Sequence, residues 1–476
     1  MNRELVSKIT LLVILLLAFG VRIGGLTAQS MWRDEVDAIR FAQTSPQTLI
    51  GYFTQPGWNG PLFYLLLRPW LEVAGQGEFS ARFFSLVFGT LSVALVYHLG
   101  RRWFSPEVGG MAALWMALSP YMVWYSQELK MYALLCTLVP ALFACYDRAL
   151  ECGGWPRWTA AVLLSWITMT THIIAALTLP ALAGLALRPT ARSKVGLPVL
   201  GIMAAPGLII LPWIAPLLIQ GQNIGHRFVP LNTMVWIMLQ AFSRGVTVIG
   251  DVWPMVVAVF GLLAGTMLWP RPRATADAQT GWRIAGLWIW LLLPLIGLYI
   301  IALRVPLFVD RYLIWIGPAF YILVARGVAE LWARSRRGAA AFILLTGMFF
   351  VLGLWTQTAN PIKSDFRAAA AFVREHRRPN ELVMFHISYI RYTFEYYYGP
   401  AAPYADGVPT DNQTLELHVD AQMRTRTAGY ETVWLVLSEP EMWDRRGMTV
   451  EWFAKHAQAA RRADFARVSV IEYRLE

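Results

Sequence analysis

The chain has 476 residues, of which 57% are hydrophobic and only 15% are charged, and its mean hydropathy is +0.45. Soluble domains contain roughly 45–50% apolar and about 25% charged residues, so this composition excludes an ordinary soluble enzyme. The net charge of +11 comes from short Lys and Arg clusters between apolar runs, which is typical of membrane-protein loops and argues against a nucleic-acid partner. We therefore expect an integral membrane protein with many transmembrane helices.

The apolar runs define a predicted all-α membrane domain over residues 1–359. A helix needs about 20 apolar residues to cross a hydrocarbon core of about 30 Å. Eleven runs approach this length, and the fifth and sixth are short enough to form a hairpin with Thr171 and His172 at its tip. The predicted spans are 7–26, 82–100, 109–126, 131–148, 158–173, 175–187, 196–219, 252–269, 284–303, 312–332 and 339–358.

The basic clusters predict the orientation of these spans. The clusters recur in alternate loops, and the positive-inside rule places such loops in the cytoplasm. The loop 27–80 and all residues after 358 should then lie outside. Within this loop, residues 34–50 suit an interfacial helix, and the run 62–71 is too short to span, so it should be interfacial or re-entrant.

The composition changes at about residue 360, where charged residues become frequent and no run is long enough to span. The pattern predicts helices at 365–376 and 450–461, and strands at 382–387, 432–437 and 468–474. Strands alternating with helices indicate a small extracytoplasmic α/β domain over residues 360–476.

Acidic residues cluster on the predicted outer face. Asp34 and Glu35 begin the first outer loop, Glu128 follows the third predicted span, and Asp310 precedes the tenth. Ionisable groups at membrane depth are costly and are functional by default, so one site could gather all four. The alternative is that they are solvated residues at helix ends.

Several sequence strings around these residues occur in a characteristic order. They are Trp32-Arg33-Asp34-Glu35, Ser80-Ala81-Arg82-Phe83, Leu118-Ser119-Pro120, the run from Tyr125 to Leu134, and Asp310-Arg311-Tyr312. This set resembles the polyprenyl-phosphate-dependent membrane glycosyltransferases of the GT-C fold, in particular protein mannosyltransferases, aminoarabinose transferases and Rgt-type transferases. The resemblance covers about residues 1–190 well and the remainder more loosely. The chain has Asn59-Gly60-Pro61 where many relatives have His-Pro-Pro, and Lys130 where many have Arg.

The resemblance implies both an activity and a location. Asp34 corresponds to the family's catalytic carboxylate, Glu35 lies beside it, and Glu128 corresponds to a second acidic position. The implied reaction is inverting transfer of a sugar from a polyprenyl-phosphate donor to an envelope acceptor, which can be a lipid, a glycan or a protein. The enzyme would be embedded among the lipids of a bacterial-type inner or plasma membrane, with its active site on the extracytoplasmic side.

The residue types agree with this chemistry independently of the family. A carboxylate such as Asp34 can accept the proton of the acceptor hydroxyl, and inversion needs only one such base. The phosphate leaving group needs cationic stabilisation, for which Lys130, Arg82 and Arg311 are candidates on the predicted outer face. Lys130 and Arg311 can also be explained as side chains that only anchor their helices at the headgroups.

Four further residues complete the predicted substrate site: Asp310, Asn59, Tyr132 and His172. His172 has no partner at metal-ligand spacing, so a structural role competes with ligand binding, and Tyr132 can equally be a packing residue. The aromatic cluster at 389–398 suits either sugar stacking or a half-buried amphipathic element. The three cysteines have no spacing typical of a zinc site, and the sequence leaves open whether a divalent cation takes part.

Two other functions compete with glycosyl transfer. A transporter or flippase usually carries polar groups at mid-membrane on broken helices, often in repeated halves, and neither feature is visible here. An envelope-assembly scaffold would leave Asp34, Glu128 and Arg311 without a shared purpose.

Overall fold

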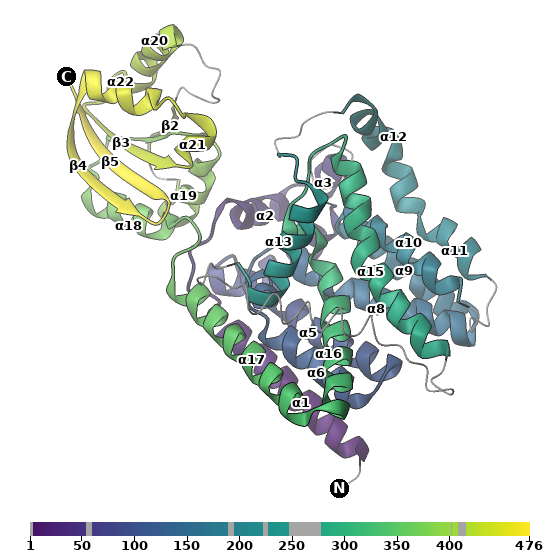
Figure 1. The fold of residues 1–476 in the computed structure, drawn as a ribbon. Helices are drawn as coiled ribbons and strands as arrows, with labels where there is room; N and C mark the ends of the chain where they lie inside the picture. Colours follow the sequence, from purple (N-terminus) through teal and green to yellow (C-terminus); the bar gives the residue numbers. More distant parts are fainter. Residues whose placement is uncertain are drawn as a thin grey trace. The chain divides into compact units, whose positions relative to one another are not determined.

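The computed structural model describes residues 3–53, 60–188, 195–221, 227–246, 278–400, 402–407 and 416–476. These residues form two compact units, which are coloured along the chain in Figure 1. The helical unit contains residues 1–26 and 41–357, and the C-terminal unit contains residues 27–40 and 358–476. The acidic segment after the first helix therefore groups with the C-terminal residues.

All regular secondary structure in the described residues of the helical unit is helical. The helices are α1 (Arg3–Ile23), α3 (Pro46–Phe53), α4 (Leu62–Ala74), α5 (Glu78–Trp103), α6 (Pro106–Leu118), α7 (Pro120–Ser126), α8 (Tyr132–Cys152), α9 (Trp155–Thr171), η1 (Ile173–Leu177), α10 (Thr178–Ala186), α11 (Gly196–Met203), α12 (Ala205–Gln220), α13 (Leu231–Arg244), α15 (Ala278–Ala302), η2 (Asp310–Ile316), α16 (Gly317–Arg334) and α17 (Arg336–Ala359). Helix α2 (Arg33–Gln43) begins in the C-terminal unit and ends in the helical unit.

The predicted number of eleven spans was wrong for the part of the chain that the structure describes. Six helices there are long and apolar enough to cross a membrane: α1, α5, α8, α15, α17 and the stretch formed by η2 with α16. The pair α11 and α12, bent by 50°, makes a seventh if it is one broken span. The predicted span 252–269 lies outside the described residues. The chain is thus an integral membrane protein, and its described residues contain fewer full-length apolar helices than their hydropathy suggests.

Breaks and short helices explain the difference. The run 109–126 divides at Ser119-Pro120 into α6, with 13 residues, and α7, with seven. Proline has no backbone N–H to continue a helix, and the Ser119 hydroxyl accepts a hydrogen bond from Met122 N, so a new helix begins there. Helix α9 has 17 residues and the apolar stretch Ile173–Ala186 is shorter, so both fall below the length of a full span.

A buried arginine joins the first helix to the centre of the helical unit. Arg22 is fully buried, and its guanidinium donates hydrogen bonds to the carbonyl oxygens of Ala117 at 2.9 Å and Met116 at 3.1 Å. Its Nε donates to Ser126 Oγ at 3.1 Å. A polar group within an apolar bundle needs such partners, so Arg22 fixes α1 against the ends of α6 and α7.

The C-terminal unit is built on a five-stranded sheet. Its strands are β1 (Leu382–Phe385), β2 (Tyr404–Asp406), β3 (Thr432–Ser438), β4 (Ala457–Phe465) and β5 (Val468–Leu475), in the order β2-β1-β3-β5-β4. Strand β1 pairs in parallel with β2 and β3, whereas β5 pairs antiparallel with β3 and β4. The helices are α18 (Phe366–His376), α19 (Ile390–Tyr398), α20 (Glu416–Thr427), α21 (Pro440–Trp443) and α22 (Met448–His456).

Helices cover both faces of this sheet (Figure 1). Successive strand residues point to opposite faces, so Val383 and Phe385 pack against α18 and α19, whereas Leu382 and Met384 pack against α20 and α22. Because both faces are buried, the central strands are continuous hydrophobic runs. This three-layer α/β arrangement agrees with the small α/β domain expected from the sequence.

In this domain the strand predicted at 382–387 ends at Phe385, one helix end was wrong, and strands β2 and β4 were not predicted. The helix predicted at 450–461 ends at His456, and the following residues form edge strand β4, which is mostly exposed. Its Ala- and Arg-rich sequence has helical propensity, but pairing with β5 overrides that local preference. Strand β2 has only three residues, too few for a periodic signal.

Candidate active site

The predicted site residues are divided between the two units. Asp34 and Glu35 belong to the C-terminal unit. The helical unit contains Arg82, Glu128, Lys130, Tyr132, His172, Asp310 and Arg311. Asn59 lies outside the described residues.

The two adjacent carboxylates at the start of α2 have different surroundings. Glu35 is fully buried, and its Oε2 lies 2.8 Å from the ammonium nitrogen of Lys363, which is also buried. The backbone N–H of Trp32 donates to the same oxygen at 3.5 Å. Asp34 is only partly buried and occupies the first turn of α2, where the positive end of the helix dipole favours a carboxylate. Of the pair, Asp34 is therefore the more accessible base.

The turn 127–131 between α7 and α8 carries Glu128 and Lys130, and both side chains are buried, with 1% and 5% exposed. Gln127 Nε2 donates to the Arg22 carbonyl oxygen at 2.8 Å, and Lys130 N donates to the Glu128 carbonyl oxygen at 2.8 Å. The Arg22 network therefore fixes the turn that holds both charged groups. The burial of Glu128 argues against the alternative that it is a solvated residue at a helix end.

Tyrosines connect this region to the Asp310-Arg311 pair. Tyr121 donates its hydroxyl proton to Asp310 Oδ2 at 2.9 Å, and Arg311 Nε donates to the Tyr132 hydroxyl at 3.0 Å. Tyr125 lies edge-on to both tyrosines, with ring centroids 4.9 and 5.3 Å away. The structure thus brings Asp310 and Arg311 of η2 together with α7 and the first residue of α8.

Arg82 and His172 are also buried in this unit. Arg82 donates to the Leu26 carbonyl oxygen at 2.9 Å, so part of its guanidinium holds the chain just after α1. The ring of His172 lies 5.2 Å from that of Tyr312, and its Nδ1 accepts a hydrogen bond from Ile174 N at 3.3 Å. Since Nδ1 is an acceptor, the proton of the neutral imidazole lies on Nε2, which has no hydrogen-bond partner among the described residues. His172 can therefore donate to a ligand.

Metal-ligating residues do not gather in the described part of the chain, where no three His, Cys, Asp or Glu side chains could hold an ion together.

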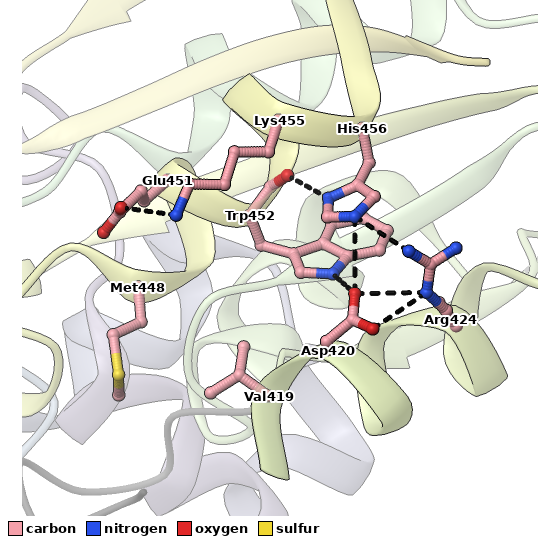
Figure 2. Close-up of a pocket in the computed structure, with 8 residues that line it drawn as sticks. All are labelled: Val419, Asp420, Arg424, Met448, Glu451, Trp452, Lys455 and His456. Atoms are coloured by element: carbon pink, nitrogen blue, oxygen red, sulfur yellow. Dashed lines mark hydrogen bonds and ion pairs between the residues drawn. The ribbon is translucent and has the colours of Figure 1, made fainter. Parts of the chain in front are cut away.

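A surface pocket of about 250 Å³ lies between α20 and α22 in the C-terminal unit, and none of the predicted site residues lines it (Figure 2). There Asp420 accepts hydrogen bonds from Trp452 Nε1 and from Arg424, both at 2.9 Å, and Glu451 pairs with Lys455 at 2.8 Å. These charged groups satisfy one another, so the pocket suggests no chemistry.

Sequence reasoning missed Lys363 and Tyr121, and it did not predict the contact that Tyr397 makes. Lys363 follows α17 in an unremarkable loop and becomes informative only when the fold pairs it with Glu35. Tyr121 lies in an apolar run with no charge beside it. Tyr397 belongs to the aromatic cluster, but its hydroxyl accepts from Met31 N at 2.6 Å, a contact that no spacing rule indicates.

Comparisons with known proteins agree with this architecture. The family model described as dolichyl-phosphate-mannose-protein mannosyltransferase matches residues 56–219, less than half of the chain. ArnT from Cupriavidus metallidurans, in its apo state, is 13% identical with a TM-score of 0.63, and 97% of each chain is covered. The same ArnT bound to undecaprenyl phosphate is 14% identical with a TM-score of 0.60 and the same coverage.

The chain has the GT-C glycosyltransferase fold. The Archaeoglobus fulgidus oligosaccharyltransferase supports this assignment, with 12% identity and a TM-score of 0.55 over all of this chain and 74% of that one. No curated protein sequence matches the chain. At these identities the comparisons establish the fold, and the site residues stay predictions.

Proposed function

We propose that this GT-C protein transfers a sugar from a polyprenyl-phosphate donor to an envelope acceptor on the extracytoplasmic face of the membrane. The observation that carries the proposal is the cationic cluster at the start of α8, where Lys130 is buried and Arg311 is hydrogen-bonded to Tyr132. Such a cluster at a helix N-terminus suits a phosphate group. The fold shared with ArnT, which was solved with undecaprenyl phosphate, supports the same ligand class.

Asp34 is the proposed general base. It accepts the proton of the acceptor hydroxyl as that oxygen attacks the anomeric carbon of the donor. The bond from the anomeric carbon to the phosphate oxygen breaks, and its electron pair leaves with the phosphate. A single displacement of this kind inverts the anomeric centre and needs only one carboxylate.

The cationic side chains bind the phosphate as its charge grows. Arg311 offers a planar fork that can hold two oxygens, whereas Lys130 acts as a compact point charge. His172 Nε2 and Arg82 are further donors, and Asp310, held by Tyr121, orients Arg311 through its neighbouring backbone. Glu128 orients a donor, an acceptor or a cation.

The direct test is transfer by purified full-length protein. The donors are radiolabelled mannosyl- and aminoarabinosyl-phosphoundecaprenol, and the acceptors are lipid, glycan and protein fractions of the envelope. The proposal expects label in one acceptor fraction, with release of undecaprenyl phosphate and an inverted anomeric linkage. Movement of the intact donor across vesicle membranes without transfer would instead identify a transporter or flippase.

A further inference from the structure

The segment 27–31, which precedes α2, is hydrogen-bonded to residues that follow α17. Gln29 Nε2 donates to the Asn360 carbonyl oxygen at 2.8 Å, and Gln29 Oε1 accepts from Ile362 N at 2.9 Å. Met31 N donates to the Tyr397 hydroxyl at 2.6 Å. Backbone and side-chain contacts thus fix this segment on the C-terminal unit.

Helix α2 itself is held by two stacked arginines. The guanidinium of Arg33 lies 3.8 Å from the ring centroid of Tyr389, and that of Arg40 lies 3.3 Å from the centroid of Tyr392. Asp37 pairs with both arginines, at 3.6 and 3.2 Å. Tyr389 and Tyr392, which were open to a sugar-stacking interpretation, therefore face the arginines of α2.

The Glu35–Lys363 pair is a buried electrostatic contact between α2 and the residues after α17. Glu35 is fully buried and the Lys363 side chain is 6% exposed. Removing one partner of such a pair leaves an uncompensated buried charge, which strongly destabilises the local structure. Replacing both partners at once with uncharged residues of similar size is far better tolerated.

Adjacent helical residues point about 100° apart, so a residue beside a buried one can face another direction. Glu35 points into the C-terminal unit, whereas Asp34 is partly exposed. We propose that Lys363 and Glu35 form a positioning pair that fixes the first turn of α2 and thereby aims the Asp34 carboxylate, while Glu35 takes no part in the chemistry. This proposal rests on the proposed function and assigns a role to the C-terminal unit.

A double-mutant cycle separates positioning from catalysis. The full-length variants are Glu35→Gln, Lys363→Met and the double variant, each assayed for kcat, for KM of the donor and for hydrogen exchange in residues 27–40. Each single variant should lose on the order of tenfold or more in kcat, because small misplacements of a reacting group are costly. Donor KM should stay near wild type, and amide exchange in 27–40 should accelerate.

The double variant should recover most of the lost kcat and amide protection, because neither buried charge is left unpaired. The matched control is the exposed pair in Glu451→Gln with Lys455→Met, which should change neither quantity. A double variant as inactive as Glu35→Gln would mean that Glu35 acts on the substrate and would overturn the proposal. Unchanged kcat and exchange in both single variants would also overturn it.

Hydrogen exchange in residues 27–40 tests the positioning pair even if the proposed function is wrong, because it does not depend on sugar transfer. If the wild type transfers no sugar from either labelled donor, the proposed function fails, but exchange in 27–40 still reports whether the pair holds the segment. Rapid exchange with no dependence on Lys363 would then overturn the positioning role on its own.

Discussion

Asp34 and Glu35 are adjacent in the chain but have different environments. The Glu35 carboxylate is neutralised by Lys363 inside the C-terminal unit, whereas Asp34 lies partly exposed in the first turn of α2. In the helical unit, burial similarly distinguishes functional candidates from ordinary loop residues. Glu128 and Lys130 belong to a turn, yet both are almost completely buried. Burial of a charged turn residue is costly, so its retention favours a role beyond solvation.

Arg311 provides the residue-scale prediction. Arg311→Lys keeps the charge but loses the planar fork and the Nε–H that bonds Tyr132, so transfer should weaken even for this mild change. Arg311→Gln should reduce kcat/KM further, while the melting temperature in detergent stays close to wild type. The control is Arg304→Gln, which changes an exposed arginine. Normal transfer by both Arg311 variants would make Arg311 a helix anchor and move the phosphate site towards Lys130 and Arg82.

At the scale of elements, hydropathy predicted where the long apolar helices lie but not which runs break. Helices α1, α5, α8, α15 and α17 correspond to predicted spans, because a run of about 20 apolar residues is unambiguous. The break at Ser119-Pro120 leaves hydropathy almost unchanged, because the residues on both sides of it are apolar.

Pairing between distant segments could not be read from the sequence. The contacts of Tyr121 with Asp310 and of Lys363 with Glu35 join residues far apart in the chain, and periodicity carries no information about such pairs. The same holds for edge strand β4, whose local preference is helical and whose conformation is set by β5.

Asp444 gives a pH-dependent prediction for α22. Burial alone would raise the pKa of Asp444, but His386 and the backbone N–H groups of Thr449 and Met448 bind the carboxylate and lower its pKa to about 2. Because this pKa lies below the unfolded value, the stabilisation is complete above about pH 5 and is lost as pH falls towards about 2.

Asp444→Asn should therefore accelerate amide exchange in α22 at pH 7, and the difference from wild type should shrink between about pH 5 and pH 2. The comparison is made at each pH, so intrinsic exchange rates cancel. Asp464→Asn, which changes an exposed carboxylate, should have little effect on α22. A difference that persists unchanged to low pH would mean that the charge of Asp444 does not stabilise this helix.

At the scale of the whole molecule, a membrane-embedded bundle carries a small α/β unit to which the segment 27–40 belongs. Covalent continuity means that the orientation of α17 decides on which side of the membrane this unit lies. The alternation of basic loops predicts the extracytoplasmic side.

A reporter that is active only in the cytoplasm, fused after Glu476, tests this orientation. We expect the fusion to be silent, because the residues after α17 should lie outside. The same reporter inserted at Ser335, between α16 and α17, should be active, since Arg334, Arg336 and Arg337 at the adjoining helix ends mark the cytoplasmic side. A strong signal from the fusion after Glu476 would reverse the assigned face of the C-terminal unit.

Turnover by Asp34→Asn tests the central claim most directly, because the proposed mechanism uses the Asp34 carboxylate as the general base. The full-length variant is compared with wild type and with Asp464→Asn, which changes an exposed carboxylate in β4. We predict that Asp34→Asn binds undecaprenyl phosphate normally and loses on the order of a hundredfold or more in kcat, in line with general-base contributions of about 10²–10⁴. Asp464→Asn should stay close to wild type. Near-normal sugar transfer by folded Asp34→Asn protein would contradict the account.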